Sequence, residues 1–338
     1  MKKLLSLTLI LAASGSFAFA ETKEVTLYTQ RHYAFDESIH EKLLEEKGIK
    51  INVVKASADE LITRLEEEGE NTSADLFMTA DGAGLDRATK AGLLQPITSE
   101  AILEMVPDTL KDADNMWVAI TNRARVIIYS KDRVDPADLS TYEDLADPKW
   151  KGRVVIRSSS NAYNQSLMTT IIAANGADKA KEWAKAVRGN MARPPQGSDR
   201  DQIRAVAAGL ADVALANTYY VGLLEYSEEE KDREAASKVG IYFPNQDGRG
   251  AHVNISGIGV VKGTENAELA QEVIAFLLSE EVQASYPQNT YEYPVNQKAA
   301  WSEIQERWGK FKADPVPLST LGEKNAEAVR LFNEAGWE

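Results

Sequence analysis

Residues 117–130 read WVAITNRARVIIYS, from Trp117 to Ser130, and this run is strand-like throughout its length. A typical strand in a globular protein has about 5–6 residues. A run this long can leave one sheet and continue into another. The sequence therefore predicts a hinge strand that joins two sheets.

The segments on both sides of this run alternate between strand and helix patterns. Before it, Val25–Tyr28 and Asp75–Thr79 have strand patterns, and Ala58–Glu68 has the pattern of an amphipathic helix. After it, Arg153–Ile156 and Ile255–Val261 have strand patterns, with helical patterns between them. Such alternation is typical of α/β folds with largely parallel sheets. We therefore predict one α/β unit on each side of the hinge strand.

The N-terminus has the pattern of a secretory signal peptide. Two lysines precede an apolar run, Leu4–Ala13, and a small-x-small motif, Ala18-Phe19-Ala20, follows it. The apolar run is shorter than the roughly 20 residues that a membrane-spanning helix needs, although an uncleaved anchor is the alternative. We predict that residues 1–20 are removed on export and that the mature chain begins at Glu21.

The composition limits the classes of function. The chain has no cysteine, which excludes disulfides, thiolate metal sites and cysteine nucleophiles. Its formal net charge of −14 opposes binding to nucleic acid or to anionic membranes. Three histidines are too few for a zinc cage. The sequence also lacks the G-x-S-x-G, Walker and H-E-x-x-H motifs, so we expect a binding protein and not an enzyme.

Tyrosines follow polar loops at three places where a predicted strand gives way to a helix. These loops are Gln30–Tyr33, Ser158–Tyr163 and Asn217–Tyr220. In open α/β sheets, ligands gather at the carboxyl ends of the strands. The three loops are therefore candidates for one binding site.

The positions of these tyrosines favour an anionic side chain. Asn161 and Thr218 are suitable N-cap residues, which puts Tyr163, Tyr219 and Tyr220 in first helical turns, where the partial charge is positive. A free phenol has a pKa near 10 and stays neutral, but a trivalent cation would favour the phenolate strongly. Ferric ion pairs best with such hard, anionic oxygen. The alternative is that these tyrosines only form local hydrogen bonds, as buried tyrosines usually do.

Two arginines are candidates for adjusting the charge of such a site. Three or four phenolates would balance or slightly exceed the charge of a ferric ion. Arg31 and Arg123 could take up the excess negative charge, or they could hold a small anion on the metal.

Three segments of the chain resemble the periplasmic ferric-iron-binding proteins of ABC transporters. They are VTLYTQRHY (25–33), SSSNAYNQSL (158–167) and ANTYYVGLL (216–224), and the resemblance runs over essentially the whole mature chain. The adjacent tyrosine pair is its most specific element. The resemblance implies a two-lobed periplasmic binding protein-like fold with crossing hinge strands and iron in the cleft between the lobes. It also implies a monomer that delivers iron to an ABC permease in the inner membrane.

The same resemblance suggests a role for individual residues. Tyr219 and Tyr220 take the places of the family's paired tyrosine ligands. Tyr163 takes that of a third ligand, and Tyr33 that of a fourth. His32 matches a position that ligates iron in some members and not in others. The chain is similar to the branch of the family that can coordinate iron mostly with side chains. Whether a synergistic anion such as carbonate also binds stays open.

Both lobes are discontinuous in this family. The resemblance therefore implies a first lobe of residues 21–121 and 246–296 and a second lobe of residues 122–245 and 297–338. The expected crossing points are Thr121, Asn245 and Asn296.

Two other functions stay open on the sequence. A protein of the same architecture could bind a small oxyanion without metal, because helix N-termini also bind anions. A periplasmic enzyme that uses tyrosine as an acid or nucleophile is the second alternative.

Overall fold

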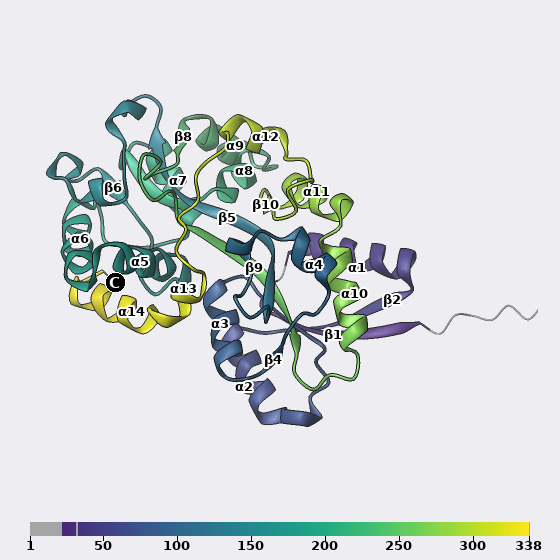
Figure 1. The fold of residues 1–338 in the computed structure, drawn as a ribbon. Helices are drawn as coiled ribbons and strands as arrows, with labels where there is room; N and C mark the ends of the chain where they lie inside the picture. The colour runs from purple at the N-terminus through teal and green to yellow at the C-terminus, as the bar shows by residue number, and fades with distance from the viewer. Residues whose placement is uncertain (1–21, 32, 338) are drawn as a thin grey trace, which may run out of the picture.

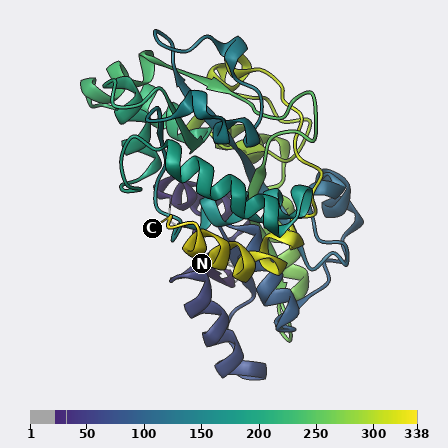
Figure 2. The same cartoon turned by 90° about the vertical axis from the view of Figure 1, so that its left-hand side faces the viewer.

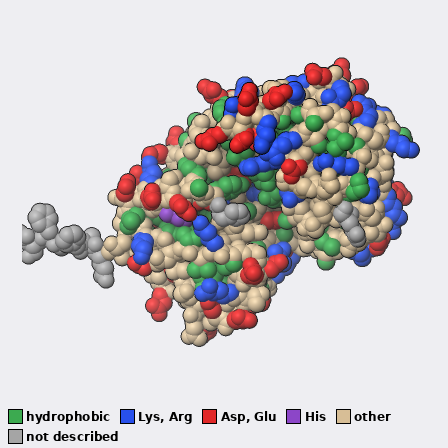
Figure 3. Space-filling model, turned by 180° about the vertical axis from the view of Figure 1, so that it is seen from behind, with side chains coloured by type: hydrophobic (Ala, Val, Ile, Leu, Met, Phe, Trp, Pro, Cys, Tyr) green, Lys and Arg blue, Asp and Glu red, His purple; other side chains and the backbone are tan. Residues whose placement is uncertain are grey.

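The computed structural model describes residues 22–31 and 33–337 and shows two α/β lobes joined by long strands (Figure 1). The predicted signal peptide, residues 1–20, lies outside the described residues. Acidic and basic side chains are both spread over the two lobes on the face that Figure 3 shows.

The first lobe contains a mixed sheet with strand order β2-β1-β3-β9-β5. In this order the strands are β2 (Ile49–Lys55), β1 (Lys23–Thr29), β3 (Leu76–Thr79), β9 (Val253–Val261) and β5 (Trp117–Ser130). Strand β1 is parallel to both β2 and β3, whereas β9 is antiparallel to β3 and β5. Two short strands extend the sheet, β4 (Leu94–Gln95) beside β9 and β10 (Tyr293–Pro294) beside β5. Because β1 and β3 are parallel and end side by side, the loops that follow them share one edge of the sheet.

Strand β5 belongs to both lobes. Its residues 117–124 pair with β9 in the first sheet, and its residues 125–129 pair with β7 (Val213–Asn217) in the second. The second sheet is completed by β8 (Val239–Tyr242) beside β5 and by β6 (Val154–Val155), which is parallel to β7. The prediction that this run passes from one sheet to another is therefore confirmed, with the same bounds.

Helices cover both lobes. Those after the first-lobe strands are α1 (Ala34–Lys47), α2 (Ala58–Glu68), α3 (Gly82–Lys90), α4 (Glu100–Met105), α10 (Ala267–Leu277) and α11 (Glu280–Asn289). Those of the second lobe are α5 (Ala162–Asn175), α6 (Ala177–Asn190), α7 (Asp199–Ala207), α8 (Tyr219–Glu225) and α9 (Glu230–Ser237). The C-terminal segment adds α12 (Glu303–Trp308), α13 (Ser319–Glu323) and α14 (Asn325–Glu334), and α14 packs on α5 and α6 (Figure 2). Within residues 22–31 and 33–337, no helix is long and apolar enough to cross a membrane.

Each lobe has its own hydrophobic core. In the second lobe, apolar residues cover both faces of the sheet, because successive side chains of a strand point to opposite faces. Ile127 and Leu215 belong to the cluster on one face, whereas Val126, Ile128 and Ala214 belong to the other. The strands that carry the tyrosine loops are therefore held in a rigid, doubly covered sheet.

Two details differ from the sequence prediction. The strand predicted over Arg153–Ile156 is only two residues long, because only Val154 and Val155 pair with β7. The C-terminal segment does not pack on one lobe alone: Leu321 lies in the first-lobe core and Phe332 in the second. The lobe boundaries along the chain remain a prediction.

Helix α2 offers a test of local stability. The Ser57 hydroxyl accepts from the Glu60 N–H at 3.3 Å and the Glu60 carboxylate accepts from the Ser57 N–H at 2.9 Å, which is a reciprocal capping box. Ser57→Ala should lower the free energy of unfolding by about 1 kcal/mol, measured by urea denaturation. Ser99→Ala is the control, because Ser99 precedes α4 without a side-chain cap bond. Equal losses in the two variants would contradict the expectation.

Candidate metal site

Four tyrosines from the two lobes line one pocket of about 180 Å³. Tyr33 follows β1 in the first lobe, whereas the other three come from α5 and α8 in the second. The residues lining this tyrosine pocket are Gln30, Arg31, Tyr33, Ala80, Tyr163, Arg200, Tyr219, Tyr220 and Leu223. The structure thus brings together the four tyrosines identified in the sequence, and their role as metal ligands remains a prediction.

The second-lobe tyrosines lie in first helical turns, but only one of the two predicted caps is present. The Asn161 side chain accepts from the Tyr163 N–H at 3.0 Å and caps α5. The prediction for Thr218 is wrong, because its backbone is already helical, with φ −50° and ψ −48°, and its side chain forms no cap bond. A capping side chain reaches the first N–H groups from an extended backbone. The Thr218 N–H instead donates to the Ala124 carbonyl at 2.9 Å, which attaches the start of α8 to β5.

The second-lobe tyrosine side chains contact one another. The Tyr219 hydroxyl donates to the Tyr163 hydroxyl at 3.2 Å. The rings of Tyr219 and Tyr220 are 4.2 Å apart between centroids. Three phenol groups therefore form one compact group on the second-lobe side of the pocket, facing Tyr33 from the first lobe.

Burial keeps the phenols of Tyr33, Tyr219 and Tyr220 neutral. Burial, and then the charge of Glu292, raises the pKa of Tyr33. Burial, and then the neighbouring Tyr163, raises the pKa of Tyr219 well above its ordinary value and that of Tyr220 to about 12. At neutral pH these hydroxyls are therefore protonated, and they would ionise only beside a strong positive charge.

Arg31 lies behind Tyr33 and has two carboxylate partners. Its Nε donates to Asp36 at 3.0 Å, and its Nη1 donates to Glu292 at 2.7 Å and to the Ser256 hydroxyl at 2.8 Å. Its Cζ is 4.5 Å from the centroid of the Tyr33 ring. The positive charge of Arg31 is therefore already shared by two acids before any ligand enters the pocket.

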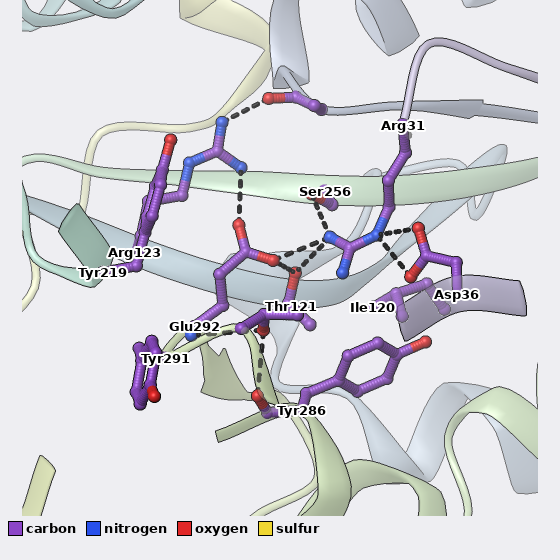
Figure 4. A network of polar contacts seen from close by, with 12 residues as sticks. Arg31, Asp36, Ile120, Thr121, Arg123, Tyr219, Ser256, Tyr286, Tyr291 and Glu292 are labelled. Atoms are coloured by element: carbon purple, nitrogen blue, oxygen red, sulfur yellow. Dashed lines mark hydrogen bonds and ion pairs between the residues drawn. The ribbon is translucent and has the colours of Figure 1, made fainter. Parts of the chain in front are cut away.

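Arg123 lies between the two lobes. It donates to the Ala80 carbonyl, and its Nη1 is 3.9 Å from Glu292 (Figure 4). Its Cζ is 5.7 Å from the Tyr163 ring centroid. Sequence reasoning did not identify Glu292. Its segment, TYEYPV (290–295), is otherwise aromatic or apolar apart from Thr290, and that context was the only local signal of a buried charge. Anion binding by the two arginines remains a prediction.

A second buried network supports the tyrosine loops of the second lobe. Asp199 is fully buried and accepts from Arg125 at 3.0 Å and from the Asn217 N–H at 3.1 Å. Arg125 also donates to the side-chain oxygens of Asn217 at 3.0 Å and Asn164 at 2.6 Å. Asn164 and Asn217 each lie within two residues of a pocket tyrosine. One guanidinium thus connects both loops, and sequence reasoning missed it because its partners are far apart in the chain.

No histidine is among the described residues that line the tyrosine pocket. His32 lies outside the described residues. His252 is buried away from the pocket, and burial, followed by the nearby Arg125, lowers its pKa to about 3, so it is neutral. Among residues 22–31 and 33–337, no group of three or more histidine and acidic side chains could hold a metal ion.

Comparisons with known proteins give consistent results. The sequence pattern of a family described as bacterial extracellular solute-binding proteins matches residues 71–312. Iron uptake protein A1 of Synechocystis sp. is 49% identical over 318 residues, which cover 94% of this chain and 88% of that protein.

Solved structures also match over nearly the whole chain. A Trichodesmium protein in complex with iron and citrate ligands is 45% identical, with a TM-score of 0.89, over 93% of this chain and all of that one. A ferric binding protein from Campylobacter jejuni is 43% identical, with a TM-score of 0.86, at the same coverage. These matches support the two-lobed fold.

Removal of the Asp199 carboxylate should destabilise the second lobe. Asp199→Ala would leave the Arg125 charge buried without its acid, and we expect a loss of about 3–5 kcal/mol in the free energy of unfolding. The measurement is urea denaturation. Asp178→Ala is the matched control, because Asp178 is an exposed acid in the first turn of α6 and should cost at most about 1 kcal/mol. A loss at Asp199 no larger than at Asp178 would be inconsistent with a tight ion pair.

Proposed function

The chain belongs to the bacterial extracellular solute-binding proteins, and from this premise we propose that it captures ferric iron and delivers it to an ABC permease. The observation that carries the proposal is that four tyrosines from two lobes line one pocket. The relatives support the cargo, since one is named an iron uptake protein and another is described with iron and citrate ligands.

In this proposal the four tyrosines bind ferric ion as phenolates. Tyr163, Tyr219 and Tyr220 supply oxygen from the second lobe, and Tyr33 supplies it from the first. The ion supplies the positive charge that these buried phenols need in order to ionise. Three phenolates balance the charge of a ferric ion and a fourth slightly exceeds it. The two helix N-termini at the pocket add partial positive charge that favours the phenolates. A small anion held near Arg31 or Arg123 would complete the coordination.

Binding would be coupled to closure of the lobes. Only a closed arrangement brings Tyr33 next to the second-lobe tyrosines. A ligand shifts a conformational equilibrium by its difference in affinity for the two states. Ferric ion would therefore stabilise the closed form, which the permease would recognise.

The remaining steps concern export and release. We propose that residues 1–20 direct export to the periplasm and are cleaved, and that the mature chain acts as a monomeric carrier and not as an enzyme. Protonation of the phenolates, or reduction to ferrous ion, would weaken binding and release the iron to the permease in the inner membrane.

The paired tyrosines provide a direct test. Tyr219→Phe with Tyr220→Phe removes two anionic oxygens and leaves the ring shapes unchanged. Ferric affinity, measured by competition with a chelator, and the visible phenolate-to-iron absorption should be lost, while circular dichroism stays unchanged. Tyr242→Phe, on β8 outside the pocket, is the control. A double variant with the parent's ferric affinity would refute the ligand assignment, and oxyanion binding without iron would favour the alternative cargo.

Iron binding should release protons. The metal-free phenols are protonated because burial raises the pKa of Tyr33, Tyr219 and Tyr220. We expect about three to four protons per ferric ion in weakly buffered solution near neutral pH. Ferric affinity should accordingly fall by about tenfold per displaced proton for each unit that the pH is lowered. Binding without proton release would show that the tyrosines do not bind as phenolates.

A further inference from the structure

Glu292 is a buried carboxylate between two buried guanidinium groups. It is 1% exposed, and it precedes β10. Its Oε2 accepts from Arg31 and from the Thr121 hydroxyl, both at 2.7 Å, and its Oε1 is 3.9 Å from Arg123 (Figure 4). Without Glu292, Arg123 would lose the one carboxylate that the structure pairs with it among the described residues.

Each of these guanidinium groups lies against a tyrosine of the pocket. The Cζ of Arg31 is 4.5 Å from the ring centroid of Tyr33, and the Cζ of Arg123 is 5.7 Å from that of Tyr163. Such cation–π contacts orient a ring and its hydroxyl. Tyr33 and Tyr163 come from different lobes, so Glu292 supports both sides of the pocket through two arginines.

Glu292 also lies where the strands that join the lobes meet. Thr121 belongs to β5, and Ser256, which shares the Nη1 of Arg31 with Glu292, belongs to β9. The residues after Glu292 form β10, in which Pro294 pairs with Thr121. One polar cluster therefore joins the pocket to three segments at the crossing between the lobes.

The neighbouring Tyr291 contacts the helix that carries the tyrosine pair. Its φ of +59° is a left-handed conformation that a non-glycine residue adopts at an energetic cost, and such strain persists where the surroundings impose it. Its ring stacks on Tyr226 at 5.5 Å and touches Gly222 of α8, where an added Cβ would lie 2.4 Å from the Tyr291 Cγ. Tyr291 thus packs on α8 while Glu292 holds the arginines.

We propose that Glu292 is a positioning residue of the tyrosine pocket, which orients Tyr33 and Tyr163 through Arg31 and Arg123. Tyr291 keeps α8 in register with this cluster. This inference rests on the proposed ferric function. It assigns to the segment that contains Tyr291 and Glu292 a role in metal affinity, in addition to its place at the crossing between the lobes.

The first experiment removes the charge of Glu292 with little change in size. Glu292→Gln should lower ferric affinity by about 10–100-fold, as loss of an outer-shell partner does at metal sites. It should also shift or weaken the phenolate-to-iron absorption, which a purely structural role would leave unchanged in folded protein. Glu143→Gln is the matched control, because it removes a carboxylate from an ion pair with Arg249 outside the pocket.

The second experiment changes no charged group. Gly222→Ala has no room for its Cβ against Tyr291 and should lower ferric affinity and alter the absorption. Gly189→Ala, also in a helix, would meet no atom within 4 Å and should bind iron as the parent does. This pair tests the contact of Tyr291 with α8 separately from the charge of Glu292. If Glu292→Gln fails to fold, Thr121→Val, which removes the hydroxyl that donates to Glu292 and keeps every charge, should lower ferric affinity in its place.

The outcomes separate this inference from the proposed function. If the parent protein binds no ferric ion, the proposed function fails and the inference fails with it. If the parent binds ferric ion, and Glu292→Gln and Gly222→Ala match their controls in affinity and absorption, the positioning role is overturned and the proposed function stands.

Discussion

One face of strand β5 supports the whole site. Side chains two residues apart on a strand point to the same face, and Thr121, Arg123 and Arg125 follow this spacing where β5 passes from one sheet to the other. Thr121 bonds to Glu292, Arg123 to the Ala80 carbonyl, and Arg125 to the two loops that carry the second-lobe tyrosines. The strand that joins the lobes is therefore also the strand that orients the pocket.

The phenols of the pocket are neutral, so the positive charge that would ionise them has to come from the cargo. Buried arginines are costly unless acids accompany them. Arg31 is paired with Asp36 and Glu292, and Arg125 with Asp199, whereas the buried phenols have no charge while the pocket is empty of metal. The charges of Arg31 and Arg125 are therefore largely taken up by these acids. The neutral group of phenols gains most from a small, highly charged cation that can replace several protons at once.

The features that the sequence predicted are those with a local signal. The hinge strand was recognisable because its strand-like pattern continues over 14 residues, and α2 was recognisable from its amphipathic pattern. The tyrosine loops were found because each follows a strand. Glu292 escaped notice because its partner Arg31 is 261 residues away, a separation that leaves no periodicity to read. Thr218 has the residue type of a cap, but its helical backbone prevents it from acting as one.

The arrangement of the pocket also determines how binding and closure can be linked. Among the residues that line it, Tyr33 is the one tyrosine from the first lobe. A ferric ion on the second lobe alone would reach three phenolates, which already match its charge, and would have little reason to close the protein. The free energy of closure must then come from Tyr33 and from the groups that orient it, Arg31 and Glu292. Because Glu292 precedes β10 at the crossing, a movement of the lobes that shifts this segment would also move the groups that orient Tyr33, so Tyr33 and the hinge are mechanically coupled.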